Sequence, residues 1–178
     1  MTTTLRSTIH AELGWIWQDH SGSGTVANSS RLRAITQLED GPGANQADAV
    51  WDAAEQTVAG GSSIVFELDS LERPIFGDTI YLSLLTVKAL AIVNRNAGAE
   101  AYLLVGGATT DPWAAPWGAA DDRAKVPQGG VLLLACPGEG WDVTPGANAL
   151  KIAAVGGAVT FDIAILGTVT ADSSSSSL

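Results

Sequence analysis

The stretch that decides the fold lies near the C-terminus: residues 149–155 (ALKIAAV), then Gly156-Gly157, then residues 158–167 (AVTFDIAILG). In the second run the apolar side chains fall on alternate positions: Val159, Phe161, Ile163 and Ile165. A period of two places alternate side chains on one face of a strand, so we expect these four to lie on a buried face. The Gly-Gly pair predicts a bend, and we expect the two runs to form a hairpin.

Upstream of this stretch, strand-like runs alternate with Gly- and Pro-rich turns. Residues 86–94 (TVKALAIVN) and 100–105 (EAYLLV) are separated by a short turn, which predicts a second hairpin. The run Leu132–Leu134 is apolar at every position, as a central strand covered on both sides would be, and a second buried face can also be a subunit interface. Further strands are expected at residues 64–68, 80–85 and 141–143. Residues 49–58 (AVWDAAEQTV) contain Ala, Glu and Gln that would suit a helix, but Trp51, Val58 and the Gly60-Gly61 that follows favour a strand. Short strands at regular spacing indicate an all-β antiparallel β-sandwich, either jelly-roll-like or Ig-like, over residues 48–171.

The two ends of the chain differ from this pattern. Residues 1–47 contain one possible strand, 11–18 (AELGWIWQ), beside polar stretches, and we interpret them as an extended N-terminal arm. Such an arm can reach a neighbouring subunit by adding a strand to an exposed sheet edge. Residues 172–178, with five consecutive serines, predict a flexible tail.

The composition restricts the function classes. The 178 residues carry a formal net charge of −10, only 16% are charged and 46% are hydrophobic, which disfavours intrinsic disorder. An acidic chain is a poor partner for phosphates or an anionic membrane face, so neither nucleic acid nor membrane is expected as a partner. Cys136 is the only cysteine, and we expect it to be a small buried core residue. The N-terminus lacks a secretory pattern, which favours folding in a reducing cytoplasm.

No catalytic, cofactor or metal motif emerges, and the sequence predicts a protein that is not an enzyme. His10 and His20 are too far apart for a typical metal pair. Asp111, Asp121 and Asp122 could offer oxygens to a calcium ion, but Asp is also ordinary in loops because it bonds its own backbone.

Tryptophan supplies the most suggestive side chains. The Pro-stiffened loop holding Trp113 and Trp117 has three interpretations: cover for one end of the core, anchors of a protein interface, or a stacking surface for a sugar. The candidates for an interface or ligand site are Trp113, Trp117, Trp141, Trp15 and Trp17.

The order of motifs over residues 49–168 resembles small β-sandwich virion structural proteins of tailed bacteriophages and prophages. The resemblance is carried by residues 90–96 (LAIVNRN), 103–107 (LLVGG), 113–118 (WAAPWG), 126–134 (VPQGGVLLL), 137–144 (PGEGWDVT) and the stretch 149–167. It implies a structural role in the particle, with no catalytic residues, and the N-terminal arm departs from the family pattern.

The resemblance leads to one expected function and one main alternative. The first is a capsid decoration or cement protein that binds the outer shell, contacts the major capsid protein or other virion proteins, and forms a homo-oligomer, with a trimer favoured. Its location would be the virion, assembled in the host cytoplasm. The alternative is a carbohydrate- or receptor-binding module of a tail or head fibre. A hydrolase with an unrecognised carboxylate pair is a third and weaker hypothesis.

Overall fold

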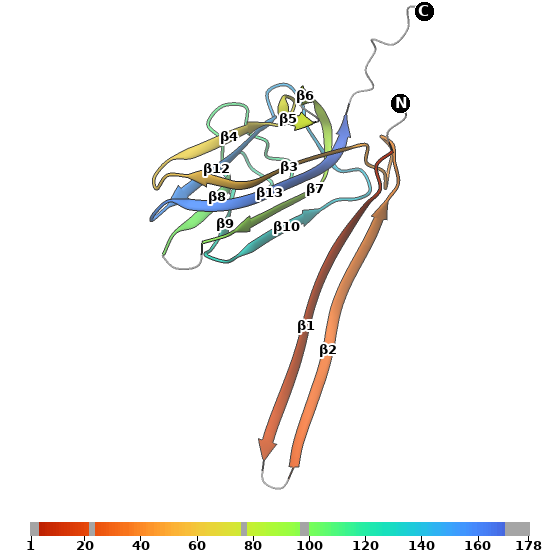
Figure 1. The fold of residues 1–178 in the computed structure, drawn as a ribbon, viewed down its shortest axis with the longest axis vertical. Coiled ribbons are helices and arrows are strands. Elements are labelled where there is room, and N and C mark those ends of the chain that lie inside the picture. The colour runs from red at the N-terminus through yellow and green to blue at the C-terminus, as the bar shows by residue number, and fades with distance from the viewer. Residues whose placement is uncertain (1–3, 22–23, 76–77, 97–99, 170–178) are drawn as a thin grey trace, which may run out of the picture.

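The computed structural model describes residues 4–21, 24–75, 78–96 and 100–169. Across these ranges the regular secondary structure consists of thirteen strands, and the strands of each sheet pair in antiparallel fashion (Figure 1). The predicted all-β antiparallel sandwich is therefore confirmed. No helix in the described ranges is long and apolar enough to cross a membrane. The Ser-rich tail 172–178 lies outside the described residues.

Two sheets form the sandwich. The first sheet has the order β10-β7-β13-β3, and a short strand, β11, also pairs with β7. The second sheet has the order β4-β12-β8-β9. The strands of the first sheet are β3 (Ala49–Val58), β7 (Leu84–Asn94), β10 (Val131–Ala135), β11 (Trp141–Asp142) and β13 (Val159–Val169). Those of the second are β4 (Ser63–Glu67), β8 (Tyr102–Gly106), β9 (Arg123–Val126) and β12 (Ala149–Val155).

The core lies between these sheets. From β13 it takes Val159, Phe161, Ile163 and Ile165, each at most 2% exposed, which confirms the predicted buried face. The neighbouring strand β7 contributes the equally buried Leu90 and Ile92. The facing second sheet contributes the equally buried Leu103, Val105, Leu150 and Ile152. The period-two alternation of apolar residues therefore identified the inner face of the strand correctly. Side chains that point into the space between the two sheets are shielded from water, so these positions are apolar.

Both predicted hairpins are wrong. The strands expected to pair across residues 95–99, β7 and β8, lie in different sheets, as do β12 and β13 on either side of the Gly-Gly bend. Each connection is a corner that crosses from one sheet to the other. The two corners touch: a Cβ on Gly156, whose φ is +85°, would lie 2.9 Å from the backbone oxygen of Glu100. A turn sequence of this kind suits a crossing as well as a hairpin, so only long-range pairing decides between them.

The expectation of a covered central strand at Leu132–Leu134 is also wrong. These residues belong to β10, which is at the edge of the first sheet. Val131 is 66% and Leu133 38% exposed, because they point to the outer face of the sheet. Cys136, expected in the core, is only partly buried, and its backbone N–H donates to the backbone oxygen of Lys88 at 2.9 Å.

Two buried polar side chains fix loops to the first sheet. Asn94, 1% exposed at the end of β7, donates from Nδ2 to the backbone oxygen of Val126 in the second sheet (3.3 Å). Lys88, 2% exposed, donates from Nζ to the carbonyls of Gly138 and Glu139 at 2.6 and 3.0 Å. The ammonium thus holds the loop that follows β10.

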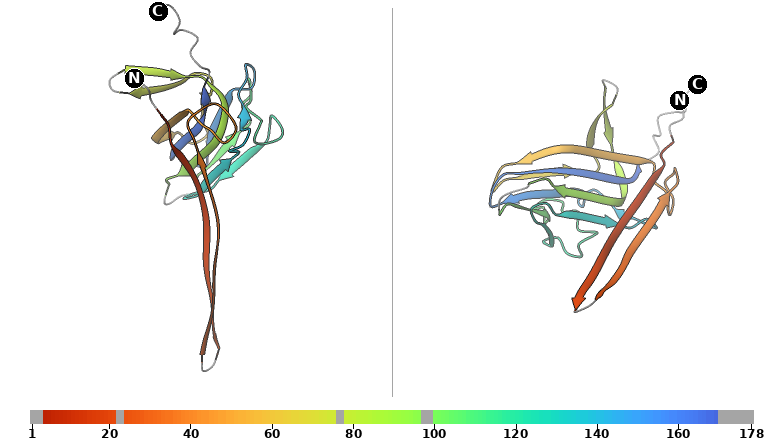
Figure 2. Two further views of the ribbon diagram at one scale, coloured as in Figure 1. Left: turned by 90° about the vertical axis from the view of Figure 1, so that its right-hand side faces the viewer. Right: turned by 60° about the horizontal axis from the view of Figure 1, so that its bottom comes forward.

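The residues of the predicted arm form a long hairpin outside the sandwich. Strands β1 (Ser7–Ser21) and β2 (Gly24–Leu38) pair only with each other, over fifteen residues each. Figures 1 and 2 show this hairpin extending away from the two sheets. A separate small hairpin, β5 (Leu71–Ile75) and β6 (Asp78–Leu82), projects from the sandwich (Figure 2). At its base, Trp51 Nε1 of β3 donates to the backbone oxygen of Glu72 at 2.7 Å.

Candidate functional site

The loop tryptophans are part of the core. Trp113 is 1% exposed, its Nε1 donates to the backbone oxygen of Asp142 at 2.9 Å, and its ring meets Trp141 edge to face at 6.4 Å and 87°. Trp117 and Trp141 are partly buried and pack against the same core. Trp113 and Trp141 are in contact and all three rings pack in or against the core, so they do not form an open aromatic groove.

Trp117 differs from Trp113 in its hydrogen bonding. Its Nε1 is buried and meets no acceptor within the part of the chain that the structure describes. The two indoles of this loop therefore differ in hydrogen bonding. The N–H of Trp113 has an acceptor, and the N–H of Trp117 has none among the described residues.

Two of the loop aspartates take part in hydrogen bonds with backbone N–H groups. Asp111 accepts backbone N–H bonds on its main-chain oxygen from Asn148 and Ala149, and Asp122 accepts one on its carboxylate from the N–H of Ala119. Over residues 4–21, 24–75, 78–96 and 100–169 there is no group of three or more His, Cys, Asp or Glu side chains that could hold a metal ion. The Asp122 carboxylate thus forms a local turn, whereas Asp111 connects its loop to the start of β12 through its main-chain oxygen.

The hairpin of β1 and β2 brings together side chains that are scattered in the sequence. Its register pairs Leu13 with Leu32, Trp15 with Ser30 and Trp17 with Asn28. Residues paired across an antiparallel ladder share a face, so every odd position of β1 lies on the same side as its partner. The side chains of this hairpin apolar face are large and solvent-exposed: Leu13 66%, Trp15 46%, Trp17 75%, Val26 71% and Leu32 69%.

The opposite face of the hairpin is polar. Glu12 pairs with Arg33 across the ladder, with Nε to Oε2 at 3.5 Å, and His10 Nε2 lies 3.4 Å from the same carboxylate oxygen. His20 Nδ1 lies 3.1 Å from Thr25 Oγ1 at the far end. The two histidines thus have separate local partners. Ile16, 72% exposed, is the main apolar member of this hairpin polar face.

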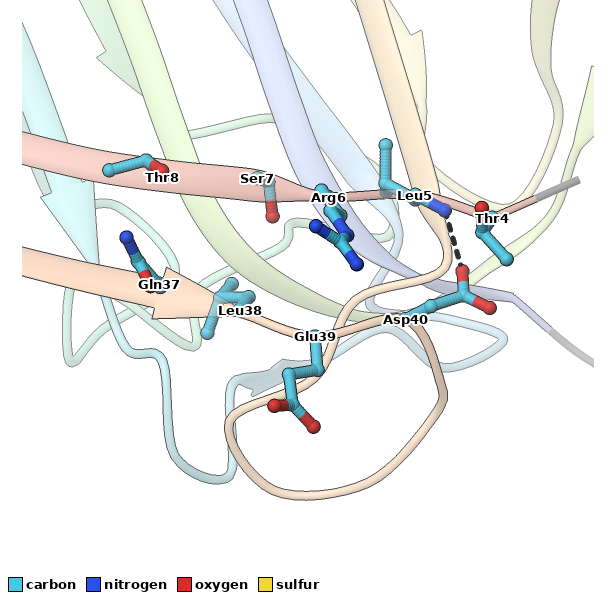
Figure 3. A pocket seen from close by; sticks show the side chains of 9 residues that line it. All are labelled: Thr4, Leu5, Arg6, Ser7, Thr8, Gln37, Leu38, Glu39 and Asp40. Atoms are coloured by element: carbon cyan, nitrogen blue, oxygen red, sulfur yellow. Dashed lines mark hydrogen bonds between the residues drawn. The ribbon is translucent and has the colours of Figure 1, made fainter.

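The root of the hairpin is fixed to the sandwich. The Asp48 carboxylate accepts the N–H of Val169 at 2.9 Å, and the N–H of Asn45 donates to the backbone oxygen of Pro137 at 3.0 Å. Where the strands leave the sandwich they border a recess of about 610 Å³, and there the N–H of Leu5 donates to the Asp40 carboxylate at 2.8 Å (Figure 3). These bonds set the direction in which the hairpin leaves.

The outer face of the first sheet is a second exposed apolar surface. Val131 and Leu133 of β10 continue into the small side chains of Ala91 and Ala164 on the neighbouring strands. At its rim the Asp162 carboxylate accepts bonds from the Glu55 N–H (2.9 Å) and from Arg95 Nε (2.6 Å). The Glu55 N–H first, and then Arg95, hold the pKa of Asp162 below its ordinary value.

Charge is divided unevenly between hairpin and sandwich. Residues 6–38 carry three arginines against two carboxylates, whereas the rest of the chain carries six basic and seventeen acidic side chains. The hairpin is therefore close to neutral, and the acidic excess of the chain belongs to the sandwich.

The sequence singled out Trp15 and Trp17 but missed Leu13, Val26 and Leu32, which complete the same face. The alternation of apolar residues at positions 9, 11, 13, 15 and 17 was the available signal. The β2 side could not be found in this way because Asn28 and Ser30 interrupt its apolar positions. Comparison of the chain with family models, curated proteins and solved structures gave no match.

Proposed function

We propose that this protein is a non-enzymatic structural component of a bacteriophage virion, a decoration or cement protein that binds the outer capsid shell as a homo-oligomer. The observation that carries the proposal is the hairpin of β1 and β2. It leaves the sandwich in a fixed direction and presents Leu13, Trp15, Trp17, Val26 and Leu32 to solvent.

The physical argument concerns what such a hairpin needs. An isolated two-stranded hairpin is at best marginally stable in water, and soluble monomers rarely expose an apolar patch of more than a few hundred Å². A long hairpin with one apolar face is therefore suited to burial against another protein chain. That is the requirement of an assembly protein, whereas a catalyst needs a site with converging polar groups.

The resemblance of residues 49–168 to virion structural proteins favours a bacteriophage particle as the assembly to which this chain belongs. The acidic sandwich suits the outside of a shell, because it would repel the packaged genome. In this arrangement the sandwich lies on the outer surface of the capsid, and the major capsid protein is its partner.

The alternative, a carbohydrate- or receptor-binding module, depends on exposed aromatic rings. Trp113 is buried and packs against Trp141, which leaves Trp15 and Trp17 as the rings available for stacking. Trp17 is 75% exposed, and Trp15 borders a wide-open recess of about 570 Å³ on the hairpin. Neither ring lies in an enclosed pocket of the kind that holds a small ligand, which favours a protein surface over a sugar as their partner.

The proposal is tested by co-sedimentation with capsid shells from particles whose gene for this chain has been deleted. The purified full chain is expected to sediment with the shells at a fixed and saturable ratio. Recovery of the chain in the supernatant at all shell concentrations would rule out the decoration role. A glycan array in which Trp17→Ala abolishes binding would favour the alternative.

A further inference from the structure

The apolar face of the hairpin is large enough to form a stable protein interface. Its side chains Leu13, Trp15, Trp17, Val26 and Leu32 are between 46% and 75% exposed. With about 150 to 250 Å² for each Trp and somewhat less for each aliphatic side chain, they expose on the order of 600 Å². A stable interface buries roughly 800 Å² on each partner, so this face with its polar margin is of the required size.

The chain's own sandwich does not cover this face. Neither β1 nor β2 pairs with any other strand, and the hairpin extends away from both sheets in all the views (Figures 1 and 2). The bonds of Asp48 and Asn45 to the sandwich fix the root, so the hairpin is directed outward and not back over its own sheets. Within the described residues, therefore, no other strand supplies a partner for this face.

The distribution of charge favours a second copy of the hairpin as the occupant of this face. An apolar face with Leu13 paired to Leu32 at its middle is the same on every copy, as a self-complementary interface requires. Sandwich surfaces of two copies repel each other, because each carries seventeen carboxylates against six basic groups outside residues 6–38. The hairpin, with three arginines and two carboxylates, is the part of the chain on which two copies can meet with little repulsion.

We propose that the apolar face of the β1–β2 hairpin is the interface between copies of this chain. Hairpins of neighbouring copies pack face to face and bury Leu13, Trp15, Trp17, Val26 and Leu32 against one another. The polar members of this face beside them are Asp19, Asn28 and Ser30, and Asp19, opposite Val26 near the tip, lies at the margin of the interface. The polar face with the Glu12–Arg33 pair stays in water on the outside of this interface. The inference rests on the homo-oligomer of the proposed function and names the surface that builds it.

Two adjacent residues of β1 provide a matched test. Trp17 is 75% and Ile16 72% exposed, but they lie on opposite faces of the hairpin. Sedimentation velocity of the full chain, over a range of concentrations and without shells, is expected to give a multiple of the 18.2 kDa chain mass. Because a central interface Trp commonly contributes about 2 kcal/mol or more, Trp17→Asp should weaken association by about 30-fold or more, while Ile16→Asp should leave it unchanged.

Three results would overturn the inference: a monomeric wild-type chain, equal effects of Trp17→Asp and Ile16→Asp, or dissociation by Leu133→Asp on the outer face of the first sheet. An unchanged far-UV circular dichroism spectrum and urea midpoint of the sandwich would show that the variants fold.

Cross-linking gives an independent measurement. In a Cys136→Ser background, Leu32→Cys on the apolar face should form cross-linked oligomers with a short bis-maleimide, and Ser29→Cys on the polar face should not. Linkage through Ser29→Cys alone would contradict the packing.

The test separates this inference from the proposed function, because it needs no shells. Copies that associate through the hairpin but do not bind shells would remove the decoration role alone. A monomer that binds shells would remove the hairpin interface alone, and the shell protein would then be the occupant of the apolar face.

Discussion

The different hydrogen bonding of the two loop tryptophans leads to the most specific prediction about the stability of the sandwich. Replacing Trp113, which is 1% exposed, by Phe removes the N–H that donates to the backbone oxygen of Asp142 at 2.9 Å. Asp142 itself is exposed and the bond is partly buried, so its loss costs about 1 kcal/mol. The smaller ring adds about 1 kcal/mol for the cavity that it leaves. Trp113→Phe should therefore lower the free energy of unfolding by about 2 kcal/mol.

Trp117→Phe is the matched control. The ring change is the same and the cavity costs about 1 kcal/mol again, but the lost N–H is buried with no acceptor in the described residues. Removing an unsatisfied donor recovers a penalty of about 1 kcal/mol or more, so Trp117→Phe should stay within about 1 kcal/mol of the wild type.

The assay is equilibrium unfolding in urea, followed by far-UV circular dichroism at one fixed protein concentration. The midpoint of Trp113→Phe should fall clearly below that of Trp117→Phe, with equal denaturant slopes. A loss of stability for Trp117→Phe as large as that for Trp113→Phe would refute the reasoning, because the hydrogen bond would then not be the source of the difference.

Three further predictions concern the first sheet. Gly167→Ala should destabilise the chain by several kcal/mol in the same assay, because its Cβ would lie 2.2 Å from the backbone oxygen of Thr86; a midpoint equal to the wild type would contradict the close approach. Lys88→Met should cost about 2 kcal/mol, because two loop carbonyls lose their charged donor; an unchanged midpoint would show that they find other donors. The Glu55 N–H lowers the pKa of the Asp162 carboxyl below its ordinary value of 3.8. The ionised carboxylate therefore stabilises the fold at pH values above this ordinary pKa, and its contribution to stability is lost as the pH falls through the lowered pKa. Unfolding midpoints measured from neutral pH downward should therefore fall less for Asp162→Asn than for the wild type, and parallel curves would contradict the linkage.

Local pattern and long-range pairing explain what the sequence could predict. The alternation from Val159 to Ile165 identified an inner face, because burial acts on each side chain separately. The partners of these strands could not be read in the same way. Gly156-Gly157 permits a tight hairpin and also a corner between sheets, and the corner is found because the backbone of Gly156 packs against that of Glu100.

The candidate site shows the same limit. Trp113 and Trp117 differ in hydrogen bonding only because Asp142, far along the chain, lies next to one indole. On the hairpin, Trp15 and Trp17 were visible as candidates, whereas Leu32 joins them only through the register of β1 with β2. The weak alternation of β2 left that register undetermined from the sequence.

Cryo-electron microscopy of particles whose genome encodes this chain tests the central claim most directly. The account predicts density for the two-sheet sandwich on the outer surface of the capsid, with the hairpins of neighbouring copies packed together along their apolar faces. Density for the chain on the tail alone, or none on the particle, would contradict it.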